Sequence, residues 1–297
     1  MSSSYVLLNG LRFHYLRWSV GDGEPIVMLH GLASNARIWE LVAPPLAAQG
    51  FLPYALDSRG HGLSDKPDGE YNFEVFFQDL SAFIERCNLE RPILVGHSWG
   101  ASIALEYAAR VNFGPRAPSA IVLVDGGIIQ MNAIPGAEWE TMRKKLTPPN
   151  LAGMSVEDFV ARLRNPQRAW QPDEQAIAIL LNNFEIDEED RITPRLTLER
   201  HMQIVRSLWD YPAYTRMKGV RCPIAAVLAA PPHQHSKDEK EFLAAKQAAA
   251  ARLLEIHPSA EVTWFHNTIH DIPLQRPVEL ADKIAVITRK YSPQSKK

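Results

Sequence analysis

A glycine-bounded turn, Gly-His-Ser-Trp-Gly at residues 96–100, constrains the fold of this chain more than any other segment. The apolar residues 92–95 precede it and indicate a buried strand, and the alanine-rich residues 101–110 follow it and indicate a helix. A strand can turn into a helix within so few residues only where glycines avoid a collision of the backbone. The G-x-S-x-G pattern in this position predicts a strained serine, Ser98, whose hydroxyl projects beyond the strand.

Short apolar runs alternate with helical patterns over the first half of the chain and again near its end. Such alternation is typical of strands and helices interleaved around a mostly parallel sheet. The Asn-Gly pair at residues 9–10 is a strong turn signal, so residues 5–18 predict an antiparallel hairpin. The sequence predicts further strands at residues 25–29, 51–56, 92–95, 120–124, 223–228 and 261–265, and helices at residues 38–49, 73–87, 101–110, 237–255 and 278–290.

The pattern changes between residues 128 and 215, where helical periodicity continues without a convincing strand. This change predicts an inserted, all-helical cap over residues 128–215, with residues 1–127 and 216–297 forming the core domain. The acidic residues 185–190 are then most simply a solvated face of that cap.

Charge and composition exclude several classes of partner. Lys and Arg number 32 and Asp and Glu number 34, for a net charge of −2, so no basic excess is present to neutralise nucleic-acid phosphates. The N-terminus has no signal-peptide pattern and no apolar run reaches the roughly 18 residues of a membrane span, so we expect a cytoplasmic protein without membrane partners. The two cysteines give no disulfide framework. We expect one main domain, as a monomer or homodimer, acting on a small-molecule substrate.

A second short segment belongs with the turn at Ser98. His30, Gly31 and Leu32 follow directly after the predicted strand 25–29. A loop in this place can set the backbone amide of Leu32 opposite that of Trp99, the first residue after the serine. Two such donors would form an oxyanion hole for a tetrahedral intermediate.

Four stretches together resemble the α/β-hydrolase superfamily, in its cap-bearing branch of serine hydrolases and esterases: residues 30–31, 57–65, 96–100 and 270–277. The resemblance implies a mostly parallel eight-stranded sheet with helices on both faces and an inserted helical cap. It also places the general base at His270, in a loop before the last helix. Epoxide hydrolases and haloalkane dehalogenases of this branch carry an aspartate at the turn, so Ser98 implies acyl transfer instead.

The acid of the triad departs from the commonest pattern of the superfamily. No carboxylate follows the predicted strand 223–228 until Asp238, at the start of the next helix. A subset of the superfamily takes the acid from the end of the sixth strand, a place held here by Asp125. The chain order Ser98, Asp125, His270 is the one this fold requires. Asp125 is therefore the predicted acid, and the alternatives are Asp238 or a site without a working acid.

The predicted function is hydrolysis of an ester or related acyl bond in a mainly apolar substrate, without metal or other cofactor. His266 and His270 have the i, i+4 spacing of a zinc helix, but the residues between them lack its glutamate. Cleavage of a carbon–carbon bond, a lactone, an amide or an iminopeptide would use the same machinery. A weakly catalytic sensor of a small ligand is the alternative from another class.

Overall fold

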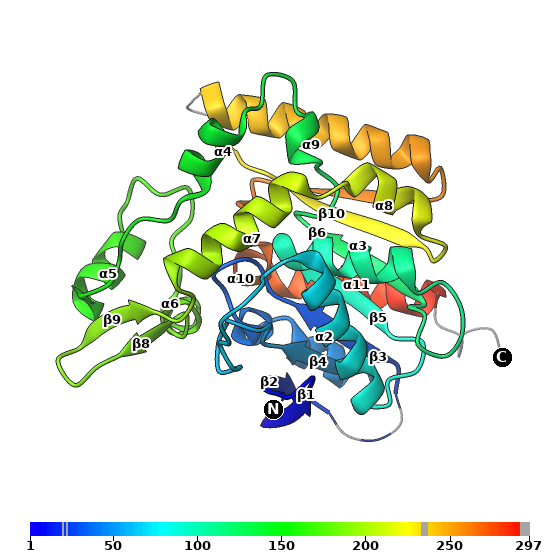
Figure 1. The fold of residues 1–297 in the computed structure, drawn as a ribbon, viewed down its shortest axis with the longest axis horizontal. Coiled ribbons are helices and arrows are strands. Elements are labelled where there is room, and N and C mark those ends of the chain that lie inside the picture. Colours follow the sequence, from blue (N-terminus) through cyan, green and yellow to red (C-terminus); the bar gives the residue numbers. More distant parts are fainter. Residues whose placement is uncertain (20, 22, 233–236, 292–297) are drawn as a thin grey trace.

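The computed structural model describes residues 1–19, 21, 23–232 and 237–291, and it contains the predicted eight-stranded, mostly parallel sheet (Figure 1). The strands follow the spatial order β1-β2-β4-β3-β5-β6-β10-β11. Six of them are parallel, and the hairpin β1–β2 pairs antiparallel at one edge. Their bounds are β1 (Ser2–Leu8), β2 (Leu11–Arg17), β3 (Pro25–Leu29), β4 (Leu52–Leu56), β5 (Ile93–His97), β6 (Ala120–Val124), β10 (Ile224–Ala230) and β11 (Glu261–His266).

Helices cover both faces of this sheet because side chains of its central strands alternate between two buried clusters. On β3, Val27 and Leu29 join one cluster, while Ile26 and Met28 join the other. The first cluster includes side chains of α2 (Phe73–Arg86), α3 (Trp99–Arg110), α8 (Ala213–Gly219) and α9 (Lys237–Ile256). The second includes those of α1 (Ala43–Ala48) and α11 (Pro277–Tyr291).

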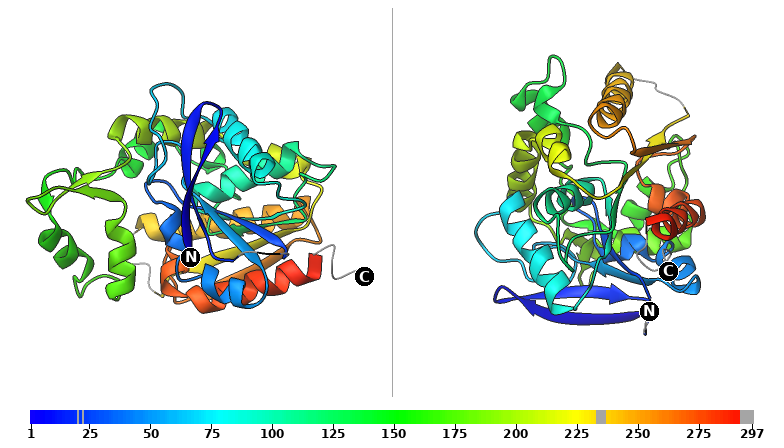
Figure 2. Two further views of the ribbon diagram at one scale, coloured as in Figure 1. Left: turned by 90° about the horizontal axis from the view of Figure 1, so that it is seen from below. Right: turned by 90° about the vertical axis from the view of Figure 1, so that its right-hand side faces the viewer.

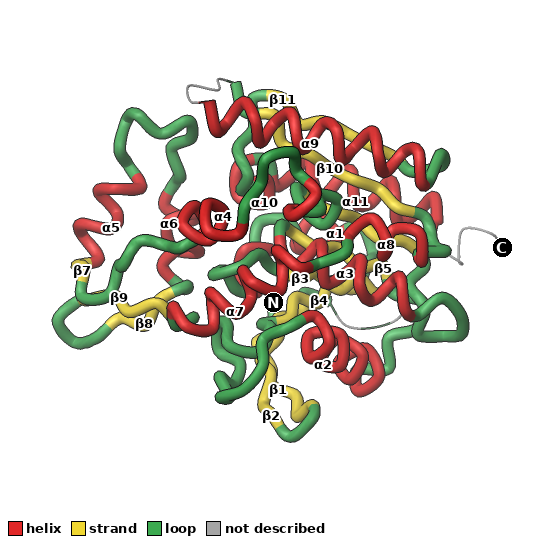
Figure 3. The backbone as a smooth tube through the Cα atoms, turned by 45° about the horizontal axis from the view of Figure 1, so that its top comes forward, coloured by secondary structure: helices red, strands yellow, loops and turns green. Residues whose placement is uncertain are grey.

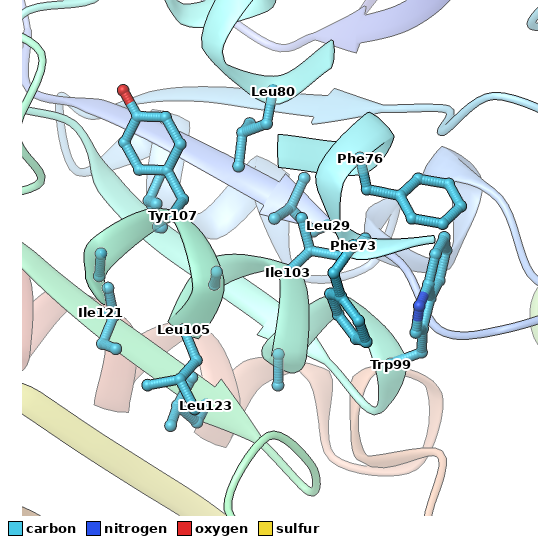
Figure 4. Packing of buried hydrophobic residues seen from close by; sticks show 14 of the residues in the cluster. Leu29, Phe73, Phe76, Leu80, Trp99, Ile103, Leu105, Tyr107, Ile121 and Leu123 are labelled. Carbon is cyan, nitrogen blue, oxygen red and sulfur yellow. The ribbon is translucent and has the colours of Figure 1, made fainter. Parts of the chain in front are cut away.

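Figure 4 shows part of the first cluster, where α2 and α3 meet over the sheet. The indole ring of Trp99 lies edge-on to Phe76, with ring centroids 4.7 Å apart. Trp99 is almost fully buried, as are Leu80 and Ile103 of the same cluster. The first residue of α3 is thereby anchored in the core, which fixes the start of that helix next to Ser98.

The helix predicted at residues 38–49 is divided in two. A short 3₁₀ helix, η1 (Ala36–Trp39), is followed by α1, which begins at Ala43. Pro44 and Pro45 lie in the first turn of α1 and carry no amide hydrogen to continue a helix from upstream. The two prolines therefore restart the helix rather than extend it.

The prediction of an all-helical insertion was wrong. Beside η2 (Met131–Ala133), α4 (Trp139–Leu146), α5 (Val156–Leu163), α6 (Glu174–Leu181) and α7 (Leu198–Asp210), the segment contains a three-stranded antiparallel sheet of β7 (Met154–Ser155), β9 (Arg191–Pro194) and β8 (Phe184–Ile186). The β8–β9 turn is closed by Asp187, whose carboxylate accepts from the amides of Glu189 and Arg191. Phe159, Phe184 and Ile192 belong to a separate small core of this segment.

Figure 2 shows that α5, α6, β8 and β9 extend away from the main sheet on one side of the molecule. Polar contacts tie the segment back to the core. Arg37 donates to the side chain of Asn182 at 3.0 Å, and Arg200 donates to the carbonyl of Lys66 at 2.8 Å. Farther along the chain, α8 packs against α3 (Figure 3). The predicted boundary between cap and core, at residue 216, falls within α8.

Among the described residues, no helix combines the length and the apolar character that a bilayer crossing requires.

Candidate active site

Ser98 lies in the turn between β5 and α3 with φ 54° and ψ −118°, a backbone conformation that L-amino acid residues rarely adopt. Its amide donates to the carbonyl of Val124 on the neighbouring strand at 2.8 Å. Gly96 and Gly100 are needed because a Cβ on either would lie 2.2 Å and 2.4 Å, respectively, from a backbone oxygen. Strain of this kind costs about 1–3 kcal/mol and is characteristic of functional sites.

Two more glycines let other loops approach Ser98. A Cβ on Gly31 would lie 3.2 Å from the Cβ of Ser98, and one on Gly126 would lie 2.2 Å from its carbonyl oxygen. Gly31 comes from the loop after β3 and Gly126 from the loop after β6. The ends of three adjacent strands therefore converge at the serine.

We expect Gly126→Ala to lower the activity at Ser98 by about 100-fold, because the added methyl would push the serine backbone out of place. The atoms that it meets are backbone atoms of Ser98, which cannot rotate away. Gly114→Ala is the control for steric contact, since nothing lies within 4 Å of the Cβ position of Gly114, whose φ of 81° is positive, unlike that of Gly126. Equal kcat/KM for both variants would contradict the close packing at Ser98.

Asp125 and His270 are 145 positions apart in the sequence, and the fold brings them together. The Oδ2 of Asp125 lies 2.7 Å from the Nδ1 of His270. Asp125 directly follows β6, with positive φ (46°) and a side chain only 1% exposed, whereas the His270 side chain is 49% exposed. The pair thus has a buried carboxylate on one side and an imidazole open to solvent on the other.

The electrostatics of the pair favour an ionised acid. Burial alone would raise the pKa of Asp125, but the contacts with His270 and Lys246 lower it to about 2. Partial burial works against a charged His270, but the hydrogen bond and charge of Asp125 outweigh it and raise the pKa of that imidazole above its usual 6.5. With Asp125 ionised, Nδ1 of His270 carries a proton and Nε2 keeps a free lone pair.

His97, the residue before the serine, connects the turn with position 270. Its Nε2 donates to the backbone carbonyl of His270 at 2.9 Å, and the two rings lie 4.8 Å apart. Burial, together with the neighbouring His270, lowers the pKa of His97 to about 4. His97 is therefore neutral near pH 7 and braces the backbone of His270 without adding a charge.

The loop that carries Leu32 is shaped by the buried His30. The Nδ1 of His30 donates to the carbonyl of Gly31 at 2.8 Å, and its Nε2 accepts from the amide of Ser58 at 3.0 Å. Leu32 is the next residue after Gly31, and Trp99 opens α3, where helix geometry leaves the first amides without a partner inside the helix. The roles of these two amides as oxyanion donors stay predictions.

Asp238, the alternative acid, lies elsewhere. It is in the first turn of α9, its side chain is 65% exposed, and it pairs with Lys145 of α4 at 2.9 Å. The geometry thus favours Asp125 as the partner of His270. As for metals, no group of three or more potential ligands is placed to hold an ion within the part of the chain that the structure describes.

A second serine–histidine–aspartate arrangement lies at the edge of the sheet. The Oγ of Ser3 is 2.8 Å from Nε2 of His14, whose Nδ1 is 2.7 Å from Asp57. Asp57 also accepts from the amides of Ala36 and Leu63. Unlike Ser98, Ser3 stands within a regular strand, β1, so this array fastens the hairpin to the loop after β4, consistent with a structural role for residues 57–65.

Sequence reasoning missed two members of this neighbourhood. In the sequence, Gly126 is only one residue of the loop that follows a predicted strand. Its contact with Ser98 depends on how β5 and β6 pair. Lys246 donates to Asp125 at 2.7 Å from α9, which the sequence predicts only as a helix at residues 237–255. Its burial beside Asp125 becomes visible only in the three-dimensional structure.

Comparison with known proteins agrees with this architecture. Residues 26–283 match the alpha/beta hydrolase family, and the chain belongs to that family. N-formylmaleamate deformylase of Pseudomonas putida is 39% identical over 121 residues, which are 40% of this chain and 43% of that protein. Bifunctional epoxide hydrolase 2 of Sus scrofa is 33% identical over 118 residues, 37% of this chain and 21% of that protein. The chain thus spans less than half the length of these curated relatives.

Solved structures match over nearly the whole chain. E-2-(acetamidomethylene)succinate hydrolase superimposes with a TM-score of 0.72 at 20% identity, covering 98% of both chains. The thioesterase domain from the curacin biosynthetic pathway gives 0.73 at 18% identity, covering 96% of this chain and 99% of that domain. At such identities the likeness shows the fold alone.

Proposed function

We propose that the protein is a serine hydrolase that cleaves an ester or related acyl bond of a small, mainly apolar substrate. The observation that carries the proposal is the 2.7 Å contact between Asp125 and His270 beside the strained turn at Ser98. An epoxide hydrolase is among the relatives, but the serine at the turn of this chain supports acyl transfer. A deformylase among the relatives is consistent with amide cleavage by the same residues.

In this mechanism, His270 accepts the hydroxyl proton of Ser98 at Nε2 while the serine oxygen attacks the carbonyl carbon. The amides of Leu32 and Trp99 hold the oxyanion of the tetrahedral intermediate. The intermediate collapses when His270 returns the proton to the leaving group, which leaves an acyl-enzyme at Ser98. A water molecule activated by His270 then attacks the acyl-enzyme and releases the carboxylic acid product. Asp125 holds the imidazole tautomer and stabilises the imidazolium throughout.

Labelling by an active-site phosphonate, combined with turnover of short p-nitrophenyl esters, tests this function. We expect one phosphonate per chain, located at Ser98 by peptide mass spectrometry, and rapid turnover of the esters. A ligand sensor built on the same scaffold would show neither. That result would contradict the proposal.

The pH dependence of ester turnover provides a separate prediction. Asp125, with a pKa of about 2, stays ionised at any pH at which the enzyme is assayed. The raised pKa of His270 means that this base is protonated, and inactive, over a wider acidic range than a free imidazole. We expect kcat/KM to fall tenfold per pH unit below an apparent pKa above 6.5. An acidic limb at or below pH 5 would contradict the pairing of His270 with Asp125.

A further inference from the structure

Lys246 is a buried cation in contact with the acid of the proposed triad. It lies on α9 and is only 5% exposed. Its Nζ donates to Oδ1 of Asp125 at 2.7 Å and to the carbonyl of Ala229 at 2.9 Å. Because a buried ammonium is costly unless it is paired and hydrogen-bonded, both contacts are needed to keep this side chain inside.

The two oxygens of Asp125 have different partners. Oδ1 accepts from Lys246 and from the amide of Ala229, the latter at 2.9 Å, while Oδ2 faces His270. A carboxylate held by two donors on one oxygen cannot rotate without breaking both bonds. Lys246 and Ala229 therefore hold the second oxygen in line with the imidazole.

We infer that Lys246 is a positioning residue for the proposed reaction: it orients Asp125 and compensates part of its negative charge, so that His270 remains a base near neutral pH. The inference rests on the proposed function. A lone buried carboxylate would favour the imidazolium more strongly than a carboxylate already paired with an ammonium. Lys246 thus moderates the basicity that Asp125 gives to His270.

The other charged or titratable groups near His270 among the described residues do not supply this compensation. His97, on β5, is neutral near pH 7 and contacts the backbone and ring of His270. Asp271, the next residue along the chain, acts in the same direction as Asp125 and raises the pKa of His270. Among the described residues, Lys246 is the neighbouring cation whose charge lowers the pKa of His270, against the effect of both carboxylates.

Lys246→Met tests this inference through the pH profile of ester turnover. The methionine keeps a similar length but removes the charge, so we expect the acidic limb of kcat/KM to move upward by about one pH unit. Lys240→Met, an exposed lysine on the same helix, is the matched control and should leave the limb unchanged. Lys246→Arg keeps a cation and should restore the limb toward the wild-type position.

A second variant and a second readout keep the test decisive. Lys246→Gln retains a polar donor without charge and replaces the methionine variant if that protein does not fold. NMR titration of the His270 ring measures its pKa without substrate, and we expect a rise of about one unit in either neutral variant. A His270 pKa equal to wild type in a folded neutral variant would overturn the role of Lys246. Failure of the proposed function is a different result, in which wild-type protein turns over no ester while the NMR shift is still measured.

Discussion

Replacing Ser98 by alanine is expected to lower ester turnover by about 10⁶-fold, the size of effect that removal of a serine nucleophile has in a well-studied protease. The variant keeps its Cβ, so the strained backbone at φ 54° is unchanged and the melting temperature should stay near that of the wild type. The remaining groups would leave only the small rate enhancement that binding and oxyanion stabilisation give. Steady-state kinetics on short p-nitrophenyl esters measure the loss.

Ser3→Ala is the matched control for that experiment. Ser3 has its own histidine and aspartate, with Ser3 Oγ 2.8 Å from His14 Nε2. It differs from Ser98 in backbone, because it stands in a regular strand instead of a turn at the start of a helix. We expect full activity in Ser3→Ala. If Ser98→Ala kept more than about one hundredth of the wild-type rate, another residue would have to be the nucleophile.

Most of the sheet and its helices could be predicted because buried parallel strands and amphipathic helices leave regular patterns in the sequence. The predicted bounds 25–29 and 120–124 agree with β3 and β6. The strands β8 and β9 were missed since each has only three or four residues and the acidic turn between them dominates the segment. A short exposed hairpin carries too few buried residues to show a period of two.

For the site, the sequence identified the residues whose positions follow from strand ends and turns. The G-x-S-x-G turn, Asp125 and His270 each follow a predicted strand. The 2.7 Å pairing of the latter two could be expected only because the ends of parallel strands meet at one edge of a sheet. Lys246 could not be found this way. Its burial depends on how α9 lies across the sheet, and nothing local distinguishes it from the exposed lysine Lys240.

Asp125→Asn is expected to lower ester turnover by about 10⁴-fold, as loss of the triad acid does in a serine protease. The reason lies in the partners of the side chain. Lys246 and the amide of Ala229 are both donors, so they hold the amide oxygen of an asparagine on their side. The amide nitrogen must then face Nδ1 of His270 as a donor, which moves the ring proton to Nε2. In that tautomer His270 cannot accept the proton of Ser98.

The same substitution should also destabilise the fold, because Lys246 would be left as a buried cation without a counter-charge. Breaking a buried ion pair from one side costs about 3–5 kcal/mol, which a denaturant titration would detect. Asp238→Asn is the control: its exposed pair with Lys145 contributes little, and turnover and stability should both stay near wild type. A larger loss of turnover in Asp238→Asn than in Asp125→Asn would mean that the acid of the triad is Asp238, reached through a rearrangement of α9.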